Sequence, residues 1–164
     1  MRVPKLRVGP FSVPELIVVG IILMILASSA NPRPGRAAAE IHAAALAGNL
    51  TILRNGLDLY ARDHNGAFPS VHNFDAQMTQ YTDAQGNTAE SRDAAHTFGP
   101  YLRKVPLLPI GPKGHRGASA VLDARATNLG AAPGAWVYDS KTGEIRANLP
   151  QQLADTSGMQ YAAY

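Results

Sequence analysis

The chain of 164 residues contains no cysteine, so a disulfide framework and a thiolate metal site are both excluded. Charged residues make up only 16% of the chain and aromatic residues only 7%. No stripe of Lys and Arg with interleaved aromatic residues follows the N-terminus, so no nucleic-acid partner is expected despite the formal charge of +3. The 15 Gly and 12 Pro show no collagen-like period, and they favour one loop-rich domain.

Motifs for catalysis or metal binding are also missing from the sequence. The glycine-rich stretch 111–117 lacks the Gly-Lys-Ser/Thr ending of a phosphate-binding loop, and no Gly-x-Ser-x-Gly occurs. We expect His64 and His115 to lie in solvated loops. No zinc-binding spacing joins the five histidines, which are His42, His64, His72, His96 and His115. The sequence therefore predicts no catalytic residue, no metal site and no enzyme activity.

The first 30 residues carry the strongest signal. A basic leader, residues 1–10, holds Arg2, Lys5 and Arg7, and no residue from Leu16 to Ala30 is charged. A helix over residues 11–30 would rise about 30 Å, which matches the hydrocarbon core of a bilayer. The basic leader predicts a cytoplasmic N-terminus with the remainder of the chain outside. We therefore expect a single membrane-spanning segment at residues 11–30.

Three interpretations of this segment are open. It has the features of a secretory signal peptide cleaved after Ala30, of a plain signal anchor, and of a pilin-type helix that builds a filament core. Glu15 favours the pilin-type helix, because a carboxylate at depth costs roughly 2.5–3.5 kcal/mol and needs a partner. In a filament, the terminal ammonium of the same or a neighbouring subunit would neutralise Glu15 and fix the subunit register. Alternatively, Glu15 lies hydrated at the headgroup level.

The nine residues from Phe11 read Phe-Ser-Val-Pro-Glu-Leu-Ile-Val-Val. This stretch resembles the prepilin N-terminal methylation motif of type IV pilin-like proteins, Phe-Thr-Leu-Ile-Glu-Leu-Leu-Val-Val. The resemblance implies processing around Gly9, Pro10 and Phe11, with Phe11 N-methylated if the cut falls directly before it. The peptidase of that family cuts after a glycine that precedes the Phe, whereas here Pro10 holds that position and Gly9 lies one residue earlier.

A second, amphipathic stem helix is expected within residues 31–65. Pro32 falls where many pilins carry a proline that loosens the helix, so we expect a break or kink there. Helical periodicity runs from Arg36 to about His64, and Asn65-Gly66 predicts the C-cap. One apolar stripe repeats every three or four residues, at Ala43, Leu46, Leu50, Leu53, Leu57 and Tyr60. It predicts packing on a small sheet, whereas the Ala-rich remainder permits close helix approach in a filament.

Residues 66–164 predict a small globular α+β domain with a loose tail from residue 150. Segments 135–139 and 144–149 alternate around a Gly-containing turn, which indicates a β-hairpin. Segment 118–124 is a third candidate strand, and three strands are needed for a stable sheet. Short helices are candidates at residues 74–81 and 89–97, on either side of a turn at residues 83–87. The expected fold class is thus α+β, with a long N-terminal helix, kinked near Pro32, on a small antiparallel sheet.

Two later stretches are similar to the major pseudopilin of type II secretion systems. Leu53–Pro69 combines a leucine run, Tyr60, an Asn-Gly turn and the pair Phe68-Pro69. Phe98–Pro106 resembles the Gly-Pro-Tyr-Leu-Lys-Lys-Leu-Pro segment of that family. The Asp-Pro-Trp-Gly that usually follows is replaced by Leu108-Pro109-Ile110-Gly111.

The resemblance implies a structural subunit of a type II secretion pseudopilus, anchored in the bacterial inner membrane with its C-terminal domain in the periplasm. Its partners would be further copies in a homo-oligomeric filament, the prepilin peptidase and other secretion-system subunits. Related pseudopilins bind calcium, but Asp123, Asp139 and Glu144 are too scattered here to predict a cage of six to eight oxygen ligands. No cofactor is therefore expected. The alternatives are a type IV pilus subunit for adhesion or DNA uptake, and a soluble or anchored binding domain released after Ala30.

Overall fold

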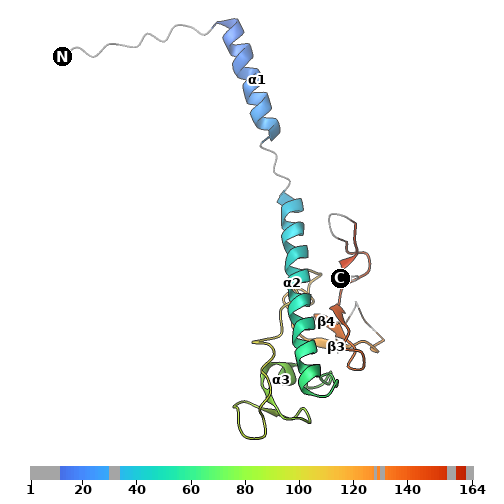
Figure 1. Cartoon of the computed structure of the whole chain (residues 1–164). Coiled ribbons are helices and arrows are strands. Elements are labelled where there is room, and N and C mark those ends of the chain that lie inside the picture. The colour runs from blue at the N-terminus through green and yellow to red at the C-terminus, as the bar shows by residue number, and fades with distance from the viewer. Residues whose placement is uncertain (1–11, 30–33, 128, 130–131, 155–157, 162–164) are drawn as a thin grey trace, which may run out of the picture. The chain divides into compact units, whose positions relative to one another are not determined.

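A computed structural model of the chain describes residues 12–29, 34–127, 129, 132–154 and 158–161 (Figure 1). The chain divides into two compact units, residues 1–35 and residues 36–164, and each is described by itself. The expected processing site lies outside the described residues; it comprises Gly9, Pro10 and Phe11. The expected helix break at Pro32 also lies outside them. The fold class is mixed α+β, as expected.

The first unit contains helix α1, Val13–Ser29. Ser12 begins it, because its carbonyl accepts the N–H groups of Glu15 at 3.0 Å and Leu16 at 3.1 Å. A Glu15 carboxylate oxygen lies 3.4 Å from the Ser12 N–H, in the manner of a capping box. Pro14 sits in the first turn, where the missing N–H has no helical partner to lose. Among the described residues, none of the helices is both long enough and apolar enough to cross a membrane.

The second unit is built on helix α2, Pro34–Asp63. The stripe expected from the leucine spacing is buried, and Leu46, Leu50, Leu53, Leu57 and Tyr60 are each at most 3% exposed. The helix ends at the Asn-Gly pair, as the sequence predicts. Asn65 and Gly66 take φ values of 55° and 85°, and the Gly66 N–H returns to the Ala61 carbonyl at 2.7 Å. The glycine makes this left-handed turn without steric strain.

A three-stranded sheet packs against α2. It consists of β3 (Val121–Asp123), β4 (Trp136–Tyr138) and β5 (Ile145–Ala147), in that spatial order. β4 and β5 are antiparallel, but β3 and β4 are parallel, so the prediction of an antiparallel sheet is wrong for one of its two pairings. Alternation along a strand reports its faces and not its direction. The connection between β3 and β4 is about a dozen residues long, which suffices for a parallel return.

A smaller hairpin lies at the other end of the unit, after helix α3 (Phe74–Thr79). It pairs β1 (Tyr81–Thr82) with β2 (Thr88–Ala89) across the expected turn. The Asp83 carboxylate holds this turn by accepting the N–H groups of Gln85 and Asn87, each at 2.9 Å. The helix expected at residues 89–97 does not form. Asp93 instead accepts the N–H groups of Ala95 and His96, and such short side-chain bonds compete with helix formation.

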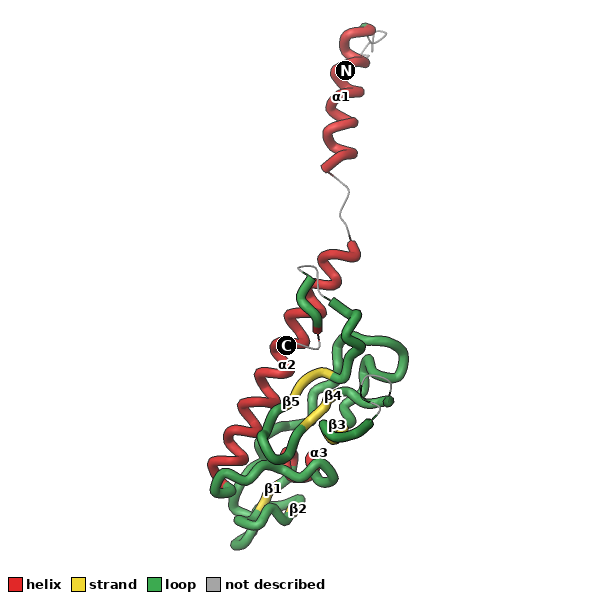
Figure 2. Tube along the Cα trace, turned by 90° about the vertical axis from the view of Figure 1, so that its right-hand side faces the viewer, coloured by secondary structure: helices red, strands yellow, loops and turns green. Residues whose placement is uncertain are grey.

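The core of the second unit fills the space between α2, α3 and the sheet, and Figure 2 shows α2 along one side of it. One residue of the expected loose tail reaches this core, whereas residues 151–154 and 158–160 are exposed. Tyr161 is only 6% exposed, and its N–H donates to the Leu153 carbonyl at 3.0 Å. Burial of this large aromatic ring favours contact of residue 161 with the core.

Two histidines that were expected in solvated loops are buried. The His64 ring stacks on Tyr60 with centroids 3.8 Å apart, and its two nitrogens lie 2.8 Å from the Tyr60 carbonyl and 2.9 Å from the Asp83 carbonyl. His115 Nδ1 lies 3.0 Å from the Asn148 carbonyl. Both rings therefore tie loops to the framework, which sequence position alone did not indicate.

Candidate assembly surface

Helix α2 carries a second apolar stripe that its own domain leaves uncovered. Ile41, Ile52 and Leu59 are 67%, 51% and 46% exposed. They follow one another after eleven and seven residues, which is about three and two helical turns, so they share one face of the helix. This face is distinct from the buried leucine stripe. The helix thus has one face for its own domain and another that is free to meet a partner.

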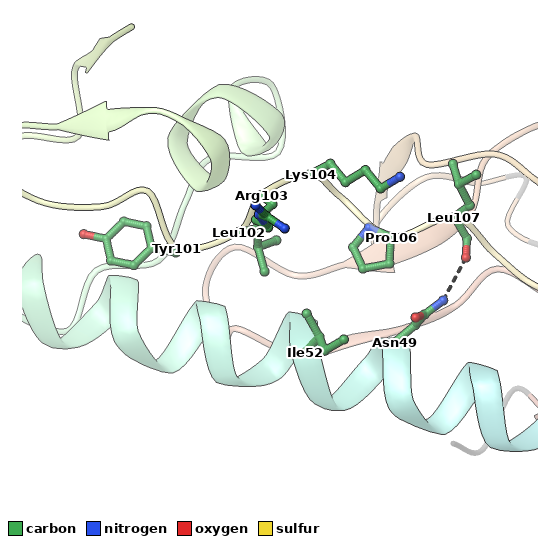
Figure 3. Close-up of a pocket in the computed structure, with 8 residues that line it drawn as sticks. All are labelled: Asn49, Ile52, Tyr101, Leu102, Arg103, Lys104, Pro106 and Leu107. Atoms are coloured by element: carbon green, nitrogen blue, oxygen red, sulfur yellow. Dashed lines mark hydrogen bonds between the residues drawn. The ribbon is translucent and has the colours of Figure 1, made fainter. Parts of the chain in front are cut away.

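Residues 101–107 run along one edge of α2 in the opposite direction to the helix. Tyr101 donates its hydroxyl to the Asp63 carboxylate at 3.0 Å, near the end of α2. At the other end of the segment, Asn49 Nδ2 donates to the Leu107 carbonyl at 2.9 Å (Figure 3). These two bonds fix the segment over about fourteen residues of helix, or roughly 20 Å.

Gly56 allows the middle of this segment to approach the helix closely. A Cβ atom at that position would lie 3.0 Å from Leu102 Cδ2 and 3.0 Å from Met78 Cε. Further along the segment, the Pro106 carbonyl accepts a hydrogen bond from Trp136 Nε1 at 2.9 Å. The segment is therefore held by both the helix and the sheet, and its shape is well defined.

A groove of about 580 Å³ lies between α2 and this segment (Figure 3). Its walls are largely apolar, and Leu107 is 49% exposed beside Ile52. Arg103 and Lys104 are exposed and bring two positive charges to its rim. The groove is lined by Asn49, Ile52, Tyr101, Leu102, Arg103, Lys104, Pro106 and Leu107. We call these eight residues the α2 groove.

The other edge of α2 faces strand β5 and is polar. Arg54 donates to the Ile145 carbonyl at 3.3 Å, which fixes that edge against the sheet. Asp58 lies one turn further along and is exposed. Together with Asn55, Leu59 and Arg62 it lines a shallow depression of about 290 Å³ on the outer side of the helix. The outer face therefore presents an exposed leucine directly beside a carboxylate.

The tyrosines at the end of α2 are kept neutral by their surroundings. Burial raises the pKa of Tyr101, and the neighbouring Asp63 carboxylate raises it further. Burial also raises the pKa of Tyr60, with a smaller contribution from Asp83. The Tyr101 hydroxyl consequently keeps its proton at neutral pH and remains a donor to Asp63. This anchor of the α2 groove is thus insensitive to pH around neutrality.

The site residues expected from the sequence fall into separate places. The five stem residues all pack inside their own domain, so they are not available to a partner. Glu15 is exposed, and its carboxylate approaches the Ser12 N–H. The α2 groove was not anticipated. Its signal in the sequence is Ile41, Ile52 and Leu59, which are large aliphatic residues that lie off the leucine stripe.

The described residues contain no cluster of three or more His, Asp or Glu side chains arranged to hold a metal ion. Of the acidic residues considered for calcium, Asp139 lies 3.8 Å from Arg125, and Asp123 accepts the Arg125 N–H at 2.8 Å. These two carboxylates therefore serve local structure.

Comparison of the chain with protein-family models, with curated proteins and with solved structures finds no match.

Proposed function

We propose that the chain is a structural subunit of a membrane-anchored filament of the type II secretion pseudopilus kind. The observation that carries the proposal is the second apolar stripe of α2, whose three large aliphatic side chains are 46–67% exposed in their own domain. Helix α1 separately exposes large apolar side chains, since those from Val13 to Ile25 are 45–77% exposed. Two successive helices with uncovered apolar faces suit a subunit that is completed by its neighbours.

The gain from covering these faces is large enough for assembly. Burial of roughly 1,000 Å² of apolar surface contributes about 25 kcal/mol at about 25 cal/mol/Å². Association costs an estimated 4–15 kcal/mol, and the ordering of side chains and the desolvation of polar groups at the contact lower the net gain further. The apolar term is therefore the favourable contribution that the proposal relies on.

In this proposal, the segment 11–30, of which α1 is a part, anchors the subunit in the bacterial inner membrane before assembly. The charge distribution supports that topology. Arg2, Lys5 and Arg7 precede α1 without any Asp or Glu, whereas residues 36–164 contain eleven Lys and Arg and eleven Asp and Glu. A basic flank of this kind stays in the cytoplasm, which would place the second unit in the periplasm.

Glu15 is the proposed registry residue of the filament. The 3.4 Å contact to the Ser12 N–H is long for a charge-assisted hydrogen bond, so it would satisfy the carboxylate poorly in an apolar filament core. A cation is needed there, and processing before Phe11 would supply a terminal ammonium four residues from Glu15. Processing and registry are thus two parts of one proposal.

The test is the intact mass and the N-terminal peptide of the protein isolated from its native membrane. The proposal expects an N-methylated chain that begins at Phe11, together with filaments visible by electron microscopy. A chain that begins at Asn31 would instead establish a released soluble domain, and the filament proposal would be abandoned. That second candidate has one observation in its favour, since residues 36–164 form a compact unit by themselves.

A further inference from the structure

We infer that the α2 groove receives Asp58 and Leu59 of a second copy of the chain, which lies parallel to the first and is shifted by about two helical turns. The inference rests on the proposed function, because it requires neighbouring copies to point in the same direction. The two copies would use different surfaces, namely the groove on one and the outer face of α2 on the other.

The stagger follows from the exposed stripe. Ile52 and Leu59 lie seven residues apart on one face, which is a distance of about 10 Å along the helix. A parallel neighbour shifted by that distance brings its Leu59 to the level of Ile52 and Leu107. These three side chains are 46%, 51% and 49% exposed in the single chain. The contact would bury all three at once, which no part of the same domain does.

Charge complementarity selects the same occupant. Arg103 and Lys104 stand at the rim of the groove, and Asp58 directly precedes Leu59 in the sequence. Insertion of Leu59 therefore carries a carboxylate towards two cations. Arg62 lies one turn beyond Asp58 on the same outer face, so the carboxylate would bridge its own Arg62 and the cations of the neighbour. A carboxylate shared between cations favours this pairing over one between two groove surfaces, which would oppose four positive charges.

The geometry of the contact leads to propagation. The groove and the depression at Asp58 and Leu59 share no lining residue, so a contact between them is heterologous although both border the exposed stripe of α2. A parallel shift without closure then repeats indefinitely and gives an open assembly. A contact between identical surfaces would stop at a dimer. The inference thus predicts a ladder of species and not a single dimer.

The absence of cysteine allows a clean test by disulfide trapping in the full-length chain. Leu59→Cys and Leu107→Cys are combined in one chain. Leu107 is bonded to Asn49, ten residues before Leu59, so the two sites lie about 15 Å apart along the helix. That exceeds the 4.4–6.8 Å between Cα atoms that a disulfide spans, which excludes a bond within one copy. Mild oxidation in native membranes is expected to yield a ladder of covalent multimers.

The controls separate the inference from the proposed function. Each single variant should give no ladder, and so should Leu59→Cys combined with Met159→Cys, at a site that is 54% exposed but outside the groove. A dimer from Leu107→Cys alone would show a symmetric contact and overturn the inference. Filaments visible by electron microscopy without a ladder from the double variant would overturn the groove contact and leave the filament proposal standing. A wild-type chain that begins at Asn31 would overturn both the groove contact and the filament proposal.

A charge exchange provides an independent readout. Asp58→Arg, and separately the pair Arg103→Asp and Lys104→Asp, are each expected to lower the yield of sedimented filaments several-fold. Combining all three changes restores the opposite charges in exchanged positions and should recover most of the yield. Recovery would not follow from damage to the fold. If the filament yield of the combined variant is reduced by as much as the separate reductions taken together, Asp58 does not contact Arg103 and Lys104 of a neighbour.

Discussion

Asn49 and Leu107 are 58 residues apart in the sequence and are joined by one hydrogen bond, from the Asn49 side chain to the Leu107 carbonyl at 2.9 Å. This bond closes one end of the segment that forms the wall of the α2 groove. The groove is therefore formed jointly by the helix and a distant loop, which is held by a side chain at the edge of the leucine stripe. The shape of the groove depends on a few such contacts, and these can be tested singly.

Replacement of Asn49 by alanine removes the bond to Leu107. We expect the free energy of unfolding of residues 36–164 to fall by about 1 kcal/mol, which is typical of one net hydrogen bond. Urea denaturation followed by circular dichroism measures this. Asn55→Ala is the matched control, because Asn55 is an exposed residue of the same helix, and it should change stability by less than about 0.5 kcal/mol. Equal effects of the two variants would contradict a role for the Asn49 bond.

Two glycines of α2 should respond in opposite ways to alanine. No atom lies within 4 Å of a Cβ at Gly48, so Gly48→Ala should stabilise the unit by about 0.5–1 kcal/mol through helix propensity. At Gly56 the added atom would meet Leu102 and Met78 at 3.0 Å, and the gain should be cancelled or reversed. Thermal melting of both variants tests the difference. A Gly56→Ala variant as stable as Gly48→Ala would show that the segment does not approach the helix this closely.

Substitutions at two neighbouring residues of α2 should affect different properties, one the stability of the unit and the other its assembly. Leu53 is fully buried, and Leu53→Ala should cost about 2–5 kcal/mol of unfolding free energy. Ile52 is half exposed, so Ile52→Ala should leave stability within about 0.5 kcal/mol but reduce filament yield. Denaturation and sedimentation on the same samples provide both readouts. If Ile52→Ala assembles normally, the second stripe of α2 is not part of an interface.

Acid should weaken the β1–β2 turn. A hydrogen bond from the Asn87 side chain holds the pKa of Asp83 below its usual value, with backbone bonds from Asn87 and Gln85 acting in the same direction. A depressed folded-state pKa means that the stabilisation is present above the unfolded value of about 3.9 and is lost as the pH falls through the folded value. Chemical shifts of the Gln85 and Asn87 amides should report the loss below about pH 4. Asp83→Asn should abolish this titration.

Glu15→Gln tests the registry role in the filament. The variant keeps a hydrogen-bonding group of the same shape but removes the charge, so α1 should still form and the chain should still reach the membrane fraction. Filament yield should fall, because the terminal ammonium of a processed chain would lose its partner. Glu15→Asp is the matched control and should retain part of the yield. Unchanged assembly of Glu15→Gln would support a hydrated Glu15 without a registry role.

Short-range patterns predicted much of the local structure. The leucine spacing predicted the buried face of α2, and Asn65-Gly66 predicted its end, because both follow from helix geometry alone. The candidate strands at 118–124, 135–139 and 144–149 contain β3, β4 and β5. In each case, the order of apolar, polar and turn-forming residues within a segment determines the structure of that same segment.

The features that were missed depend on contacts between distant segments. The direction of β3 is set by a long connection and not by its own residues. The bond between Tyr101 and Asp63, the burial of Tyr161 and the contact of His64 with the Asp83 carbonyl each join parts of the chain whose proximity no local pattern encodes. The α2 groove was missed for the same reason, since only half of it comes from the helix.

The equal numbers of acidic and basic residues in residues 36–164 affect how many identical copies can be stacked together. Identical copies stacked in large numbers would accumulate electrostatic self-repulsion if each carried a net charge, and growth would become harder with every addition. A unit with no net formal charge avoids this repulsion, so the free energy of adding a copy would not depend on the number of copies already assembled. Salt should then alter the alignment of neighbours through their local charges, while the length that the assembly can reach is left to the supply of subunits.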